Sequence, residues 1–280
     1  MVVLLSISII AVVVMNCLSN YVGKKYIQDK KDSYVFNVIQ YLVPFIIFLC
    51  ISLTQKVSLF SVVFGILFGF VTVLSGTSKL IALSIGPMYI TNLIYTSSMI
   101  IPTVSGVFFG EKLSMLKIVF IVLLICFLFI TTFKRGNDKN FNVKWLFFSF
   151  AGFLFCGTIG VLQKVFRATE YGDQTSPFLA SAFFVSFLYS LIMSRGKSEK
   201  RNKNFFVTAI ICGVCVYLCN HINLYLSGIV ESQLFFPLVN GIPLVLCSIL
   251  AFTVFKEKFR PVQLIGLIGG IMCLVLICFV

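Results

Sequence analysis

Long apolar runs alternate with short polar stretches along the whole chain. Each run is about 20 residues long, which is the length that an α-helix needs to cross the hydrocarbon core of a bilayer. The runs lack the two-residue alternation of a membrane-barrel strand, and backbone polar groups in lipid must be bonded within the structure, so the predicted elements are helices. The ten predicted spans are residues 1–22, 35–53, 58–83, 87–109, 115–133, 145–166, 177–194, 205–228, 231–255 and 261–280.

Charged and turn-forming residues separate these spans. The sequence SIGP, which ends at Pro87, indicates a tight turn in which the proline begins the next helix. The polar segment 134–140 is the main linker in the middle of the chain. The connections between predicted spans are at most about a dozen residues long, so they leave no room for a soluble catalytic domain.

The composition agrees with this pattern. The 280 residues are 59% hydrophobic and 11% charged, whereas soluble domains carry about 25% charged residues. All ten cysteines lie in apolar runs, where we interpret them as packing residues rather than as a disulfide framework. The first run lacks a basic leader and a small-residue cleavage site, so we expect it to be retained as the first helix of a multi-pass protein of the cell membrane.

Basic residues are concentrated in alternate connections, which bears on orientation. By the positive-inside rule these connections should be cytoplasmic, and with ten helices both termini would then lie outside. The net charge of +13 would face anionic lipid, so the lipid bilayer is an expected partner and nucleic acid is not. The basic residues concerned are Lys24, Lys25, Lys30, Lys31, Lys134, Arg135, Lys139, Arg195, Lys197, Lys200, Arg201, Lys203, Lys256, Lys258 and Arg260; the other connections hold only Lys56, Lys112, Lys117 and Arg167.

Two short matches relate the halves of the chain. The sequence GEKLSMLKIVFI in the first half aligns with KEKFRPVQLIGL in the second, which places Glu111 opposite Glu257 at an offset of 146. Lys24, at the end of the first apolar run, aligns with Lys164 at an offset of 140. The two offsets agree on a repeat of about half the chain.

An odd number of helices in each repeat inverts the second copy relative to the first. We therefore predict an all-α integral membrane protein of about ten transmembrane helices, arranged as two inverted five-helix repeats. The first repeat would span residues 1–136 and the second residues 137–280.

This arrangement resembles the drug/metabolite transporter superfamily, and most closely its EamA-like branch, in which the motif G/K-E-K-L/F lies between the fourth and fifth helices of each half. The family's helix-end lysine corresponds to Lys24 or Lys25 and to Lys164, and its prolines to Pro102 and Pro243. The resemblance implies a secondary transporter, with efflux as the expected direction, that moves a small metabolite or drug-like compound by alternating access. It also implies cytoplasmic termini, which conflicts with the orientation from the loop charges.

Polar residues inside the apolar runs are the candidate functional residues, because polar groups are costly in a bilayer. The third span of each half carries a polar cluster, SGTSK ending at Lys79 and CNHIN ending at Asn223. At the offset of 146, Ser75 aligns with His221 and Thr77 with Asn223. Matching clusters at one depth are the pattern expected of a site near the membrane midplane between two repeats.

Three of the candidates carry a titratable group. His221 is the only histidine, and its titration near neutral pH would suit coupling to protons; the alternative is an interhelical hydrogen bond. Lys79 lies about one turn from its helix end, where it could snorkel to the interface or bind an anionic substrate. Glu231 begins the ninth span, where the helix dipole favours a carboxylate; the alternative is an acid on the substrate pathway.

Uncharged residues complete the set of candidates. Several are amides that could open or line a cavity between helices. The predicted cavity residues are Asn16, Asn20, Ser75, Thr77, Lys79, Asn92, Tyr95, Asn220, His221, Asn223, Glu231 and Asn240.

Catalysis and metal binding find little support in the sequence. No G-x-S-x-G, H-E-x-x-H or Walker A motif occurs, and the nine carboxylates are scattered, so we expect neither an enzyme nor a cofactor. A metal site of Cys212, Cys215, Cys219 and His221 is disfavoured, because His221 lies about 200° around the helix from Cys219. A lipid-linked carrier or flippase of the same architecture is the alternative function, and we expect a monomer or a homodimer.

Overall fold

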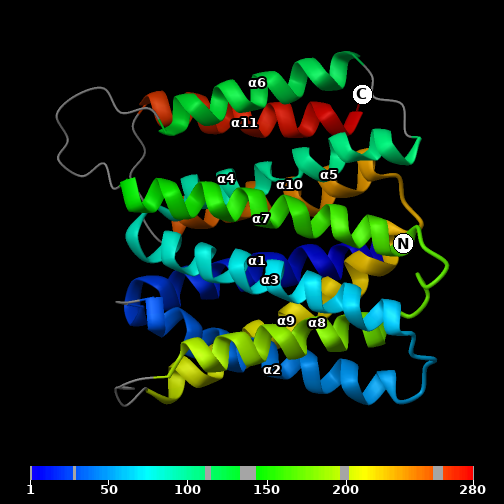
Figure 1. Cartoon of the computed structure of the whole chain (residues 1–280). Coiled ribbons are helices and arrows are strands. Elements are labelled where there is room, and N and C mark those ends of the chain that lie inside the picture. The colour runs from blue at the N-terminus through cyan, green and yellow to red at the C-terminus, as the bar shows by residue number, and fades with distance from the viewer. Residues whose placement is uncertain are drawn as a thin grey trace.

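The computed structural model describes residues 2–27, 30–110, 115–132, 143–195, 202–254 and 261–279, and every regular element in these ranges is helical. The long helices lie along one axis of the molecule, and the direction of the chain reverses from one membrane-length helix to the next (Figure 1). Their bounds are α1 Val2–Tyr26, α2 Lys30–Ser52, α3 Leu59–Ile85, α4 Met88–Ser97, α5 Ile100–Ser105, η1 Gly106–Phe109, α6 Met115–Thr132, α7 Val143–Arg167, α8 Thr175–Met193, α9 Lys203–Ser227, α10 Ser232–Thr253 and α11 Pro261–Phe279.

Within the described ranges, six helices are long and apolar enough to cross a membrane, namely α1, α2, α3, α7, α8 and α9. Their outward-facing side chains are apolar: Val3, Leu67 and Phe147, for example, are 71%, 50% and 66% exposed. A soluble protein rarely exposes contiguous apolar surface on this scale, whereas lipid accommodates it. The chain is therefore a helical membrane protein.

The fourth predicted span, residues 87–109, is broken into α4, α5 and the 3₁₀ helix η1. Pro102 provides the physical reason, because its ring nitrogen has no hydrogen to donate to the carbonyl four residues earlier. At the break, the amides of Ser98 and Met99 bond to carbonyls three residues earlier, at 3.1 Å each. The other predicted spans agree with single helices whose ends differ by a few residues.

Close helix packing in the core depends on small residues. A Cβ atom on Gly65 of α3 would lie 2.4 Å from the carbonyl oxygen of Phe178, and one on Gly69 would lie 2.2 Å from that of Ala182. The two glycines are one turn apart, so α3 and α8 approach backbone to backbone along this stripe. The hydroxyl of Ser186 on α8 donates to the Gly69 carbonyl at 2.8 Å.

Helices that are distant in sequence pack side by side. The most extensive contacts join α2 to α8 and α9, α3 to α7 and α8, and α1 to α9. The helices α6 and α11 pack against each other and form one edge of the molecule (Figure 1).

The two ends of the bundle differ in charge. We call "the basic face" the end where α1, α3 and α8 terminate and where α2, α7 and α9 begin; its charged residues include Lys24, Lys25, Lys31, Asp32, Lys144, Arg195 and Lys203. The opposite face carries Lys56, Arg167, Glu170, Asp173 and Glu231. The first helix begins and the last helix ends at the opposite face (Figure 1). The start of α1 and the end of α11 therefore lie at the face away from the basic residues.

Candidate functional site

A cavity of about 180 Å³ lies between α1, α2, α3, α4, α7 and α9. Several of its lining residues occupy the middle of their helices, such as Met15 in α1, Tyr41 in α2, Thr72 in α3, Cys156 in α7 and Val216 in α9. Because a spanning helix places its central residues near the bilayer midplane, the cavity lies about halfway through the membrane.

Lys79 of α3 brings a positive charge to this cavity. Its Nζ donates a hydrogen bond to Oδ1 of Asn16 on α1. The same Nζ lies 5.5 Å from the ring centroid of Tyr95 on α4, a distance at which a cation is attracted to an aromatic ring. Lys79 thus joins α1, α3 and α4 at the cavity wall.

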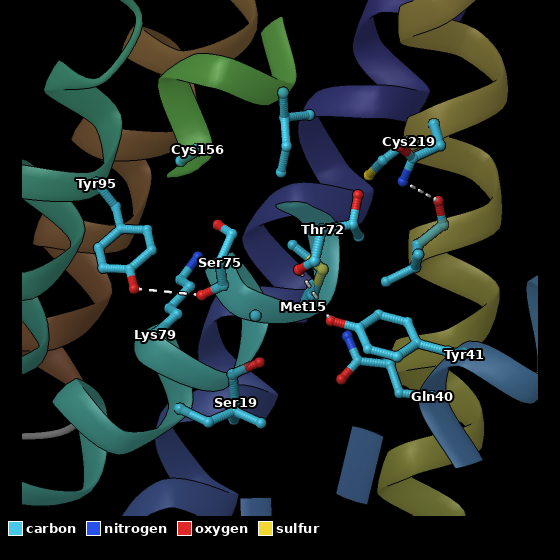
Figure 2. Close-up of a pocket in the computed structure, with 15 residues that line it drawn as sticks. Met15, Ser19, Gln40, Tyr41, Thr72, Ser75, Lys79, Tyr95, Cys156 and Cys219 are labelled. Atoms are coloured by element: carbon cyan, nitrogen blue, oxygen red, sulfur yellow. Dashed lines mark hydrogen bonds between the residues drawn. The ribbon is translucent and has the colours of Figure 1, made fainter. Parts of the chain in front are cut away.

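Two tyrosines contact α3 from different sides, as Figure 2 shows. The Tyr95 hydroxyl donates to the carbonyl of Ser75 at 3.3 Å, and the Tyr41 hydroxyl donates to the carbonyl of Thr72 at 3.4 Å. Ser75 and Lys79 are one turn apart and face the cavity together. The site therefore combines one ammonium group, two phenol groups and short polar side chains.

Glycines make room for the tyrosine hydroxyl groups. A Cβ on Gly76 of α3 would lie 2.1 Å from the Tyr41 oxygen, and a Cβ on Gly152 of α7 would lie 1.7 Å from the Tyr95 oxygen. Any larger residue at position 152 would displace Tyr95 from its bond to Ser75. The glycines are therefore part of what shapes the site.

Four of the predicted residues line the cavity: Ser75, Lys79, Tyr95 and Asn220. Asn16 contacts it through Lys79. Sequence reasoning missed Gln40, Tyr41 and Ser19, which also line it. Gln40 carried a usable signal, because it is an amide in the middle of an apolar run.

Asn20 and Asn92 are buried one turn away from Asn16, the partner of Lys79, and from the cavity residue Tyr95, on the same helix faces. Their side chains are 0% and 2% exposed, and neither amide has a hydrogen-bond partner among the described residues. An unsatisfied buried polar group costs about 1–3 kcal/mol. The polar surroundings of Lys79 thus continue from the cavity toward the basic face.

The structure places His221 outside the cavity. Its side chain is exposed on the outer surface of α9 and stacks on Tyr217, with ring centroids 5.8 Å apart. The repeat offset aligned His221 with Ser75, but α9 instead turns Cys219 and Asn220 toward the cavity. Since each residue rotates the helix by about 100°, the side chain two positions after Cys219 points nearly the opposite way. We therefore omit His221 from the candidate site.

Four other predicted residues lie away from the cavity. Thr77 accepts a hydrogen bond from Nδ2 of Asn37 at 2.9 Å, and Asn223 accepts one from the Ser8 hydroxyl at 2.7 Å. These bonds join α2 to α3 and α1 to α9. The remaining two are Glu231, which is exposed at the N-cap of α10, and Asn240, whose Nδ2 donates to the carbonyl of Phe236 in its own helix at 2.8 Å.

A second buried lysine lies near the opposite face. Lys164 of α7 is 9% exposed, and its Nζ donates to the hydroxyl of Ser232, the first residue of α10. The surroundings are closely packed, because a Cβ on Gly160 would lie 2.8 Å from the ring of Pro102. Lys164 aligned with Lys24 in the repeat alignment. Its contact between α7 and α10 could not be predicted from the sequence, because it depends on how the two helices pack.

The residues that line the cavity can bind a small molecule. No group of three or more described His, Cys, Asp or Glu residues could hold a metal ion. Cys212, Cys215 and Cys219 are buried, whereas His221 is exposed, so these four residues do not converge. The cavity instead offers hydrogen-bond donors and one cation between apolar walls, which is a usual composition for a small-molecule site.

Comparisons with known proteins show that the fold also occurs in solved structures. No family model and no curated protein matches the chain. Among 28 matching chains of solved structures, one crystal structure, described only as that of a protein, covers 99% of this chain and 99% of its own length. The TM-score is 0.64 at 14% sequence identity. At that identity the likeness shows the fold alone.

Proposed function

We propose that the protein is a secondary transporter of a small organic solute, which works by alternating access between two five-helix halves, residues 1–136 and 137–280. The observation that carries the proposal is the cavity about halfway through the bundle, because helices of both halves line it. A binding site at the midplane between repeats is the arrangement that secondary transporters use.

The pattern of helix contacts supports two equivalent halves. Exchanging α1 with α7, α2 with α8, α3 with α9, the α4–α5 segment with α10, and α6 with α11 turns each major contact into another major contact. The pair α3–α7 becomes α9–α1, and α3–α8 becomes α9–α2; the pairs α2–α8 and α6–α11 become themselves. Five spans in each half make the two halves inverted in the membrane.

The same exchange supports ten spans. The broken segment from α4 to η1 occupies the place in the first half that α10 occupies in the second. The helices α6, α10 and α11 have 18, 22 and 19 residues, which is within the range for a crossing. The resemblance of the sequence to the drug/metabolite transporter superfamily points the same way.

The size of the cavity favours a small solute. Pockets for drug-sized ligands measure about 300–1,000 Å³, whereas this one measures about 180 Å³. A lipid-linked molecule would need a larger and laterally extended site, so the small-solute transporter is the better supported of the two functions.

Blocking the cavity tests the proposal. We expect purified protein in proteoliposomes to take up members of a panel of small metabolites, and Ser75→Phe to abolish uptake by filling the cavity. The matched control is Thr158→Phe, because Thr158 lies on the exposed side of α7. Both variants should be checked for a wild-type melting temperature. Absence of uptake for the whole panel, or equal uptake by Ser75→Phe and wild type, would contradict the proposal.

A further inference from the structure

Lys79 is the one charged side chain among the described residues that line the cavity. Within the described ranges its polar contacts are the Asn16 amide oxygen and the Tyr95 ring, both neutral. An ammonium group has three hydrogens to donate. An unneutralised charge inside a membrane is costly, and such residues pair or mark a pathway for substrate or ions.

The sequence offers no carboxylate at this depth. All nine Asp and Glu residues lie at the ends of the apolar runs or between them. Those that the structure describes, Asp32, Glu170, Asp173 and Glu231, lie at the two faces of the bundle. Asp173 pairs with Arg167 at 3.5 Å, at the opposite face. A counterion for Lys79 would therefore have to come from outside the protein.

The direction of the Lys79 side chain argues against snorkelling. Lys79 lies six residues before the end of α3 at Ile85, or about 9 Å from the basic face. Its partner Asn16 lies ten residues before the end of α1 at Tyr26, or about 15 Å from that face. A snorkelling lysine would extend toward the interface, whereas this ammonium group reaches toward the middle of the membrane.

We propose that Lys79 binds the carboxylate of the transported solute, and that this solute is a small monocarboxylate with an apolar or aromatic body. The proposal rests on the transport function proposed above. One lysine neutralises one negative charge, so a monoanion leaves the site neutral and a dianion would not. The Tyr95 ring lies beside Lys79, and Met15, Ile159 and Val216 offer apolar walls for the rest of the solute.

Probes that share a phenyl ring and differ in charge test the assignment. We expect benzoate to raise the melting temperature of the purified protein at constant ionic strength, and benzamide and benzyltrimethylammonium, which have similar bodies, to leave it unchanged. Lys79→Gln should weaken benzoate binding about ten- to a hundred-fold, the value of one charge-assisted hydrogen bond. Lys79→Arg should retain the preference for benzoate. Lys164→Gln is the matched control, because it removes a buried lysine that does not line the cavity.

The outcomes separate this proposal from the transport function. Benzamide binding as tightly as benzoate, benzoate binding unaffected by Lys79→Gln, or no binding of benzoate, acetate and phenylacetate would each overturn the carboxylate assignment. Uptake of neutral solutes that Ser75→Phe abolishes would leave transport intact in those cases. Conversely, benzoate binding that depends on Lys79 without uptake of any solute into proteoliposomes would support the anion site and contradict transport.

Discussion

Lys79 and Lys164 are two lysines in similar sequence contexts with different surroundings. Each lies near the end of a long apolar helix, and each donates to a neutral side chain of another helix. Lys79 faces a cavity and bonds toward the middle of the membrane, whereas Lys164 is 9% exposed and bonds to the first residue of α10. Both lysines therefore join helices, but only Lys79 also lines the cavity between α1, α2, α3, α4, α7 and α9.

The packing around the two lysines also differs: it is close near Lys164 and leaves a cavity near Lys79. Near Lys164, the α7 backbone at Gly160 packs closely against the ring of Pro102. Near Lys79 there is a cavity, and the amides of Asn20 and Asn92 have no partner in the described part of the chain. Unsatisfied polar groups beside an open space are expected where stability has been lost in favour of binding. Measuring how substitutions at the two lysines change the free energy of unfolding can therefore distinguish a binding residue from a structural one.

Replacing each lysine by methionine gives the largest expected effect. Lys164→Met should lower the free energy of unfolding by about 1–3 kcal/mol, because it leaves the buried Ser232 hydroxyl without its lysine donor. Lys79→Met should instead raise the stability of the ligand-free protein, because removing a charge inside the membrane that has no carboxylate partner among the described residues outweighs the lost bond to Asn16. Melting temperatures of the two variants in detergent, without added solute, check both signs. A loss of stability in Lys79→Met as large as that in Lys164→Met would show that Lys79 is a structural contact.

An intermediate effect is expected at the unpartnered amides. Asn92→Leu should raise the unfolding free energy by about 1 kcal/mol, because it replaces a fully buried polar group without a partner by an apolar one of similar size. The control is Asn37→Leu, which should lower it, because Asn37 donates to Thr77 on the neighbouring helix. Equal destabilisation of both variants, measured by thermal melting, would show that Asn92 is bonded in the folded protein.

The smallest effect is expected at the histidine. His221→Phe should leave solute uptake and its dependence on pH unchanged, because the imidazole lies on the outer surface and stacks on Tyr217, a contact that a phenyl ring preserves. Uptake into proteoliposomes at several pH values around neutrality provides the measurement. A shift of the pH profile in this variant would return His221 to the transport pathway.

Part of the site could be predicted because polar residues in apolar runs are few. Asn16, Ser75, Lys79 and Tyr95 were found in this way, and the cavity brings them together. The prediction of His221 rested in part on the repeat alignment, and the structure places this residue outside the cavity. The alignment paired Ser75 with His221, but a small error in register rotates a helical residue by about 100° per position, so the predicted side chain faced outward. Gly152 was missed because a glycine in an apolar run shows no polar signal, and its value is the space it leaves for Tyr95.

The sequence by itself determined that the protein is helical, that it lies in a membrane and where most of its helices begin and end. Run length and hydropathy are local properties, and the cost of an unbonded backbone in lipid leaves few alternatives to helices. The tertiary structure decided which polar residues face a common space and which only join two helices. That distinction depends on the rotation of each helix and on its neighbours, which come from distant parts of the chain. It made Lys79 the candidate ligand-binding residue and Lys164 a helix contact.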